Sequence, residues 1–276
     1  MQPGIHHLTY TISQVQPLIN WLYFYHAWGL SGKPQAHQQQ LRREAEAMLS
    51  QMVSEGCQPR AVVGLFDANS KGDDIIVGDT RIPMLRQQHP TQPGQPNMCL
   101  ADFIRPVESG QTDVLGIFAT TMHLPPENET TDDPYKKMMR QTLADRLAEA
   151  TAELAHQEVR RHLWGYAPDE QLTVSQLHQE AFQGIRPAVG YPSLPDTSIN
   201  FIIANLIGIG DIGIRLTESG MMVPHASVSG FMFAHPEARY FDVGKIGNDQ
   251  LRDYARRRGI PVSMMQRFLS SRLLKR

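Results

Sequence analysis

Residues 184–195 read Gly-Ile-Arg-Pro-Ala-Val-Gly-Tyr-Pro-Ser-Leu-Pro, and this stretch fits neither a helix nor a strand. Its prolines fix the backbone, and the proline that follows Arg186 keeps that arginine out of helical geometry. Gly190 can take backbone angles that other residues take only at a cost. We therefore expect a stiff, extended loop that presents one guanidinium, from Arg186, and one phenol, from Tyr191.

The side chains of this loop suit the recognition of a small anion or zwitterion. An arginine can bind a carboxylate or phosphate in a bidentate manner, and a tyrosine can stack or donate a hydrogen bond. A glycine between them lets a ligand approach the backbone. From this segment alone two interpretations remain open: a ligand-binding loop, and a structural connector whose arginine forms a surface ion pair.

The overall charge argues against a nucleic-acid partner. The 276 residues carry a formal net charge of −2, without the basic excess that such partners require. Basic residues gather only near the C-terminus, where a solvated helix face and a docking patch for an acidic partner are both open. A hydrophobic content of 41% is enough to bury a large core.

The sequence shows no signal for export or for a membrane. Its two cysteines, Cys57 and Cys99, are too few for a disulfide framework and lack the spacing of metal ligands. Residues 1–10 hold no basic region followed by an apolar one, and the longest apolar run, residues 199–209, is too short to span a bilayer. We therefore expect a cytoplasmic protein with no membrane partner.

Helix and strand patterns are mixed along the chain without regular alternation. Apolar periodicity predicts helices over residues 39–55, 133–164, 175–182, 198–207 and 249–258. Apolar runs predict strands over residues 60–66, 75–77, 113–121, 213–218 and 227–234. We expect a turn-rich loop over residues 67–74 and a surface excursion over residues 87–97. This order favours an antiparallel α+β layer over a doubly wound parallel sheet.

Two other patterns fail as cofactor sites. Residues 208–213, Gly-Ile-Gly-Asp-Ile-Gly, have the glycine spacing of a dinucleotide-binding loop. A helix is expected before them and a strand after them, which reverses the order that this fingerprint needs. Glu218, His225 and His235 show no paired ligand spacing, so we expect no metal site.

Two carboxylates, Asp145 and Glu149, lie four residues apart in the helix expected over residues 133–164. They therefore share one helix face, where like charges repel each other unless a cation lies nearby. From the residues alone, a solvated helix face with Arg146 beside it is the simpler interpretation.

Several longer motifs occur in a fixed order on both sides of the arginine loop. Before it come Gly-Asp-Asp-Ile at 72–75, Leu-Arg-Gln-Gln at 85–88, Leu-Ala-Asp-Phe at 100–103, Leu-Ala-Asp-Arg-Leu-Ala-Glu-Ala at 143–150 and Trp-Gly-Tyr-Ala at 164–167. After it come Leu-Thr-Glu-Ser at 216–219, Ala-Ser-Val-Ser-Gly at 226–230, Phe-Ala-His-Pro-Glu-Ala-Arg-Tyr-Phe at 233–241 and Asp-Gln at 249–250. On these motifs the chain, from residue 20 to residue 259, resembles the activation domain of cobalamin-dependent methionine synthase.

The resemblance implies a single helmet-shaped α+β domain over residues 19–276, preceded by a leader over residues 1–18. Its sheet would be twisted, mainly antiparallel and flanked by helices. The domain would bind S-adenosylmethionine and present its methyl group to cob(II)alamin of a methionine synthase core, for reductive reactivation to methylcobalamin in methionine biosynthesis. Flavodoxin or a similar reductase would supply the electron. The domain would be a component of a methyltransferase, inactive without its cobalamin-bearing partner.

The resemblance also implies roles for residues of the loop. Arg186 matches the arginine that holds the carboxylate of the methionine part of the ligand. Ala188, Gly190 and Tyr191 match the segment that lines the same site. No residue of the domain is expected to act as a catalytic nucleophile.

Residues outside the loop take further roles by the same resemblance. Tyr240 and Phe241 match an aromatic pair at the adenosyl side, where an aromatic face near a sulfonium adds about 0.5–2 kcal/mol. Glu180 matches an acidic residue just before the loop. Asp145 and Glu149 match carboxylates that face the cobalamin-bearing domain, which makes them an interface and not a solvated surface.

The chain departs from the family pattern in two places. The family has an aspartate before the first tryptophan, where it binds the ligand's amino group, whereas this chain has Asn20 before Trp21. A neutral partner contributes about 0.5–1.5 kcal/mol against about 1.5–3 for a charged one, so we expect weaker affinity. The segment over residues 121–133 is shorter than in the family and lacks part of an acidic stretch that meets the cobalamin domain.

The residues ahead of Asn20 are too few for the homocysteine, folate and cobalamin modules of a complete methionine synthase. The chain is then either a detached activation protein that works in trans or an excised piece, and a start at Met1 with a short leader favours the first. An alternative function is a sensor that binds S-adenosylmethionine and has lost reactivation. A methyltransferase for another acceptor would need an acceptor pocket and a general base, and neither is identifiable.

Overall fold

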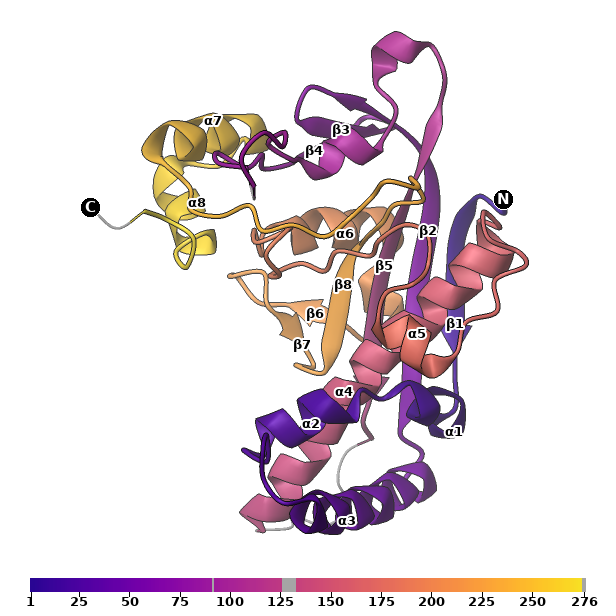
Figure 1. Cartoon of the computed structure of the whole chain (residues 1–276). Coiled ribbons are helices and arrows are strands. Elements are labelled where there is room, and N and C mark those ends of the chain that lie inside the picture. Colours follow the sequence, from indigo (N-terminus) through magenta and orange to yellow (C-terminus); the bar gives the residue numbers. More distant parts are fainter. Residues whose placement is uncertain (91, 126–132, 275–276) are drawn as a thin grey trace.

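The computed structural model describes residues 1–90, 92–125 and 133–274, and its centre is an antiparallel sheet (Figure 1). The strands follow the order β4-β3-β2-β5-β8 in the described part of the chain, and β1 also pairs with β2. Their bounds are β1 (Gly4–Thr9), β2 (Gln58–Lys71), β3 (Asp74–Val77), β4 (Thr80–Pro83), β5 (Asp113–His123) and β8 (Ser227–Met232). The expected α+β class with a mainly antiparallel sheet is confirmed.

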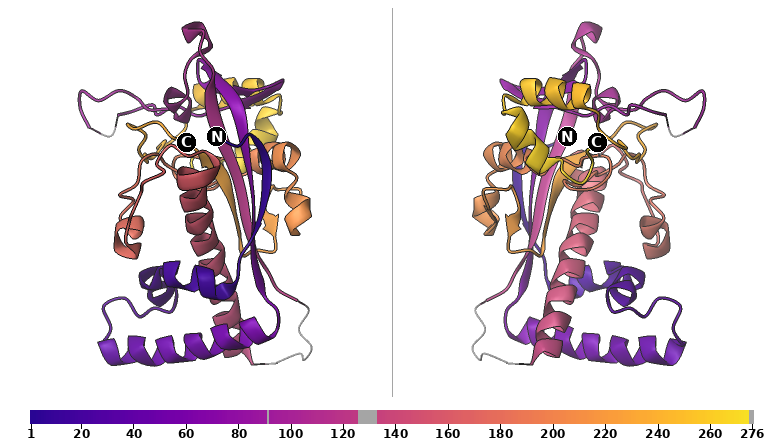
Figure 2. Two further views of the ribbon diagram at one scale, coloured as in Figure 1. Left: turned by 90° about the vertical axis from the view of Figure 1, so that its right-hand side faces the viewer. Right: turned by 90° about the vertical axis from the view of Figure 1, so that its left-hand side faces the viewer.

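Helices cover both faces of this sheet. Figure 2 shows α4 on one side of the strands and α6 on the other. The helices are α1 (Ile12–Val15), α2 (Trp21–Ala27), α3 (Gln35–Ser54), α4 (Pro134–Glu158), α5 (Val174–His178), α6 (Ile199–Ile207), α7 (Asn248–Arg258) and α8 (Val262–Phe268). Within the described residues, none of these helices is both long and apolar enough to cross a bilayer.

Each face of the sheet has its own hydrophobic core, because side chains along a strand alternate between the two faces. On β2, Val62 belongs to the core beneath α6 and α7, and Val63 to the core beneath α4. On β5, Ile117 belongs to the core beneath α6 and α7, and Phe118 to the core beneath α4. A sheet that is apolar on both faces has to be covered on both, which explains the two helical layers.

Residues 67–74 differ most from the expectation of a turn-rich loop. Strand β2 continues to Lys71, and the turn is confined to the two residues before β3. The polar side chains of this stretch are compatible with a strand because they are exposed or hydrogen-bonded. Asn69 donates to the carbonyls of Arg105 and Gln111, at 3.1 and 2.8 Å, and Ser70 donates to Ile104 at 2.8 Å.

Other predicted elements are present with different bounds. The strand expected over residues 213–218 is reduced to β6 (Arg215–Leu216), which pairs with β7 (Met222–Val223). The helix expected over residues 175–182 ends at His178. An α-helix does precede the glycines of residues 208–213, and Gly208 ends it in the left-handed conformation. Only a single 3-10 turn, Ile209–Ile212, follows Gly208, so the order differs from that of a dinucleotide-binding loop.

The predicted leader, residues 1–18, is part of the folded domain. All of β1 pairs with β2, from Gly4 opposite Leu65 to Thr9 opposite Arg60. The helical turns that follow bury Ile12 and Val15 in the core beneath α4. This strand was not expected from the sequence, because the adjacent pair His6 and His7 separates Ile5 from Leu8 and breaks the alternation that marks a strand. Its hydrogen bonds go to a distant segment.

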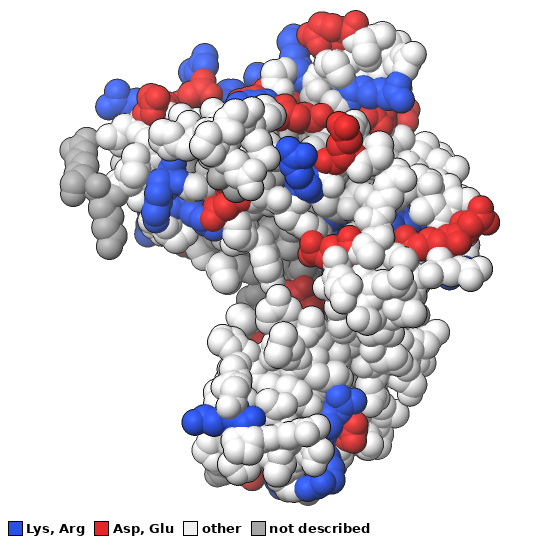
Figure 3. All heavy atoms as spheres, viewed as in Figure 1, with Lys and Arg blue, Asp and Glu red and all other residues white. Residues whose placement is uncertain are grey.

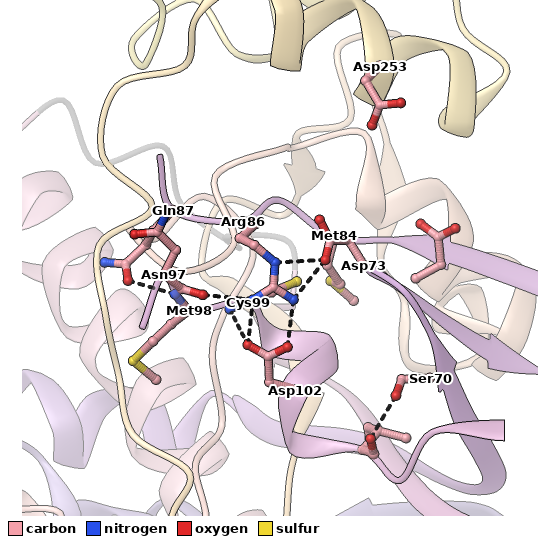
Figure 4. Close-up of polar contacts among 12 residues, drawn as sticks. Ser70, Asp73, Met84, Arg86, Gln87, Asn97, Met98, Cys99, Asp102 and Asp253 are labelled. Carbon is pink, nitrogen blue, oxygen red and sulfur yellow. Dashed lines mark hydrogen bonds and ion pairs between the residues drawn. The ribbon is translucent and has the colours of Figure 1, made fainter. Parts of the chain in front are cut away.

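Three of the motifs described above meet at Arg86 (Figure 4). Its guanidinium donates to Asp73 at 2.8 Å and, with two nitrogens, to both carboxylate oxygens of Asp102 at 2.8 and 2.6 Å. A further hydrogen bond of 2.7 Å reaches the carbonyl of Asn97. Arg86 therefore joins the β3–β4 hairpin to the far end of the excursion over residues 87–97.

The pairing of β1 with β2 makes the first residues necessary for stability. We expect deletion of residues 1–9 to lower the free energy of unfolding by about 2 kcal/mol or more, because it removes a run of strand hydrogen bonds, each with a net contribution of about 0.5–1.5 kcal/mol. Denaturant titration followed by circular dichroism measures the loss. An unchanged midpoint would show that β1 contributes nothing to the folded state.

Candidate functional site

The arginine loop is held against the free edge of β8. The amide of Ile185 donates to the carbonyl of Phe233 at 3.0 Å, and that of Phe231 donates to Pro187 at 3.1 Å. The amide of Val189 donates to Ser229 at 2.9 Å. The prolines keep the segment from forming a regular strand, yet enough amides remain to fix it along β8.

Glycines make this close approach possible. A Cβ atom on Gly230 would lie 2.2 Å from the carbonyl oxygen of Pro187, and one on Gly184 would lie 2.2 Å from that of Phe233. Gly190 serves the turn instead, with a φ of +91° and an amide that donates to Leu194 at 2.8 Å. The backbone of the loop is therefore set by contacts that no larger residue permits.

A cleft of about 660 Å³ opens between this loop, the middle of α4 and the start of α2. In Figure 3 the molecule is hollowed between the end that carries α2 and α3 and the end that carries α7 and α8. Of the expected ligand residues, those that line the cleft are Asn20, Glu180, Arg186, Ala188, Tyr191, Tyr240 and Phe241. Gly190 lies outside the lining.

Arg186 reaches into the cleft with a side chain that is 18% exposed. Its Nη2 donates to the Glu153 carboxylate at 2.6 Å. Burial by itself lowers the pKa of this guanidinium, but the nearby acidic groups, Glu153 first among them, together raise the pKa above its ordinary value. The arginine is thus charged, anchored from behind and open toward the cleft.

The aromatic pair lies beside the arginine. The Tyr240 hydroxyl accepts a hydrogen bond from the amide of Arg186 at 3.0 Å, and burial raises the pKa of this phenol. Ser193 donates to the carbonyl of Phe241 at 2.7 Å, and the buried Gln87 donates to that of Asp242 at 2.8 Å. The arginine loop and residues 240–242 therefore form one continuous wall of the cleft.

Asn20 stands at the opposite end of the cleft as the N-cap of α2. Its side-chain oxygen accepts from the amide of Leu22 at 3.2 Å. Asparagine and aspartate cap helices equally well, so the capping role does not explain which of them occupies this position. The residue both begins the helix and lines the cleft.

Glu180 has an unusual backbone. Its φ of +56° is, among the described residues, the sole positive value outside glycine, and such strain is concentrated at functional sites. Burial raises the pKa of its carboxyl group, and the guanidinium of Arg186 opposes that shift. Strain and a shifted pKa at a cleft residue both indicate a role other than packing.

The two helix carboxylates have separate partners. Glu149 lines the cleft and accepts a hydrogen bond from the Tyr191 hydroxyl at 2.7 Å. Asp145 accepts from Gln141 at 2.9 Å and lies 3.2 Å from Nδ1 of His225. The structure therefore brings Glu149 into the cleft and leaves Asp145 outside its lining.

Glu153, the direct partner of Arg186, was not among the expected site residues. Arg146, Tyr23 and Asp242 also line the cleft and were not expected there. A signal for Glu153 was present, because it follows Glu149 by four residues and so continues the same helix face. Among the described residues, no three metal-ligating side chains come together, and Glu218, His225 and His235 do not form a site.

The fold and the cleft define a ligand-binding α+β domain whose site combines a fixed guanidinium, an aromatic wall and several carboxylates. The family model described as vitamin B12 dependent methionine synthase, activation domain, matches residues 11–259. The chain therefore belongs to the family of methionine synthase activation domains. A similar solved structure is the crystal structure of the MetH reactivation domain bound to AdoHcy, with 39% identity and a TM-score of 0.92. The match covers 100% of this chain and 92% of that one.

The contact between β8 and the arginine loop can be tested at Gly230. We expect Gly230→Ala to lower the free energy of unfolding by about 1–3 kcal/mol, because the new methyl group overlaps the Pro187 carbonyl. Gly210→Ala is the matched control, since a Cβ there meets nothing within 4 Å and its effect stays within about 0.5 kcal/mol. Equal stability of the two variants in denaturant titration would contradict the close approach.

Proposed function

We propose that this domain binds S-adenosylmethionine in the cleft and presents its methyl group to the cobalamin of a separate methionine synthase core. In the overall reaction, cob(II)alamin takes one electron from flavodoxin or a similar reductase. The methyl group then passes to cobalt, and S-adenosylhomocysteine is released. The observation that carries the proposal is a single cleft lined by Arg186, Asn20 and the pair Tyr240 and Phe241.

The residues present fit such a ligand. Arg186 supplies a planar donor for the carboxylate, Asn20 an oxygen near the amino group, and the aromatic pair a face for the adenosyl part. Four carboxylates and two guanidiniums line the cleft: Glu149, Glu153, Glu180 and Asp242 against Arg146 and Arg186. This excess of negative charge favours a ligand with a net positive charge, such as a sulfonium.

The contribution of the domain to the reaction is placement. Binding holds the methyl donor at the correct distance and angle, so its loss of entropy occurs before the reaction. This can lower the activation barrier by up to about 7–11 kcal/mol. The similarity of this chain to a domain that was crystallised with AdoHcy supports the ligand class.

We propose that the face toward the partner includes Asp145 and Glu149, at the cleft. The shortened segment expected to meet the partner falls largely on residues 126–132, outside the described residues.

The ligand assignment is tested first at Arg186. We expect Arg186→Ala to weaken S-adenosylmethionine binding about 100-fold, because it removes a charge-assisted hydrogen bond to the carboxylate. Isothermal titration calorimetry measures the affinity, and circular dichroism checks the fold. Arg186→Lys keeps the charge but loses the planar guanidinium, so its affinity should fall between those of the unmodified chain and the alanine variant. Unchanged binding in the alanine variant would refute the assignment.

Asn20 provides a test in the other direction. We expect Asn20→Asp to tighten S-adenosylmethionine binding about fivefold, because a carboxylate binds an ammonium more strongly than an amide does. Aspartate is an equally good N-cap, so the stability of α2 should not change. Weaker binding by this variant in the same calorimetric assay would show that position 20 does not face the amino group.

Reactivation is tested with a cobalamin-bearing methionine synthase core that lacks its own activation domain. With this chain, S-adenosylmethionine and reduced flavodoxin, we expect the absorbance of cob(II)alamin to be replaced by that of methylcobalamin. The same mixture with Arg186→Ala is the control. Ligand binding without methylcobalamin would favour the alternative function, a sensor that has lost reactivation, for which Asn20 is the motivating difference.

A further inference from the structure

A buried row of alternating charges lies behind Arg186. Arg186 donates to Glu153 at 2.6 Å, and the other oxygen of Glu153 lies 4.0 Å from Nη1 of Arg160. Arg160 in turn donates with two nitrogens to Glu170, at 2.8 and 2.7 Å. Glu153 and Glu170 are each 7% exposed and Arg160 is 0% exposed, so the row runs from the cleft into the interior.

A local change in the helix places Arg160 inside. Helix α4 ends at Glu158, and residues 159–163 form a π-helical turn, a feature that is frequent at functional sites. The guanidinium of Arg160 lies 4.2 Å from the centre of the Phe182 ring. Phe182 lies two residues before the arginine loop. The turn therefore connects the end of α4 to the base of the loop.

The row is balanced in charge, with two guanidiniums and two carboxylates, and Glu153 lies between the two guanidiniums. Burying a lone charge is costly, and here each guanidinium has a carboxylate beside it. His156, fully buried next to the row, stays neutral because burial, and then the charges of Arg160 and Arg186, hold its pKa well below the ordinary value. Without Glu153, Arg160 and Arg186 would lack the negative charge between them.

Glu153 also fixes the direction of Arg186. The Nε of Arg186 is buried and makes no hydrogen bond to any described residue, so the bond to Glu153 is the side-chain contact that orients the guanidinium. Other carboxylates near the arginine, those of Glu149 and Glu180, act on it through their charge. If Glu153 were neutral, these groups would draw the guanidinium out of its position.

We propose that Glu153, whose second oxygen faces Arg160, is a positioning residue that aims the Arg186 guanidinium at the carboxylate of the ligand. This inference rests on the proposed function, because it concerns the same cleft. It adds a carboxylate, 7% exposed at the wall of the cleft, that acts through the arginine.

The test compares two ligands that differ in the carboxylate. S-Adenosylmethionine carries the amino-acid part, whereas methylthioadenosine lacks it. We expect Glu153→Gln to weaken S-adenosylmethionine binding at least about tenfold and to change methylthioadenosine binding less than about twofold. Glu158→Gln is the matched control, because it removes the same charge from the same helix at an exposed position paired with His162. It should leave both affinities unchanged.

Each outcome separates this inference from the proposed function. If the unmodified chain binds neither ligand, the proposed function fails. If it binds both, and Glu153→Gln weakens both equally or neither, the positioning role is overturned. Thermal unfolding establishes whether the variant folds. If Glu153→Gln does not fold, Glu153→Asp replaces it in the test, because it keeps the charge but draws the carboxylate back by one methylene. Glu153→Asp should show the same selective loss of S-adenosylmethionine binding. Unaltered binding by this variant would refute the inference.

Discussion

The pairing of the arginine loop with the edge of β8 is the interaction on which the site depends. A segment rich in proline cannot form a full strand. Its remaining N–H groups nevertheless donate to carbonyls along β8, and its carbonyls at Ile185 and Pro187 accept from amides there. Gly230 lets the two backbones approach, so the loop is fixed to the edge strand of the central sheet. Ligand-binding groups held on a rigid scaffold require little reorganisation when the ligand arrives.

Electrostatics then determine what this fixed site can accept. The guanidinium of Arg186 is held by a buried carboxylate on α4, and the aromatic pair is joined to the same wall by Ser193 and Tyr240. On the other side, α4 and the segment before the loop add carboxylates of their own. A cleft with more carboxylates than guanidiniums suits a ligand that carries one negative and more than one positive group.

The sequence was sufficient for the elements with strong local signals and not for those that depend on distant partners. The periodicity of α4 and the apolar runs of β5 and β8 located these elements closely, and the loop over residues 184–195 was correctly judged irregular. The strand β1 was missed because its six residues, Gly-Ile-His-His-Leu-Thr, gain their hydrogen bonds from β2. The end of β2 was missed because Asn69 and Ser70 resemble turn residues until their partners near residue 105 are known. Of the residues that line the cleft, Arg186 and Tyr240 were expected from motifs. Glu153 had only its spacing from Glu149 as a signal, and it became a candidate once the fold placed it against Arg186.

The loop touches α4 through two contacts of very different exposure. Arg186 meets Glu153 at the base, where little water reaches, and Tyr191, which is 52% exposed, meets Glu149 at the rim. A hydrogen bond at the rim is readily exchanged for one with water, whereas the buried pair is costly to separate. The hydrogen bond at the rim can therefore exchange with water while the base of the loop stays fixed to α4.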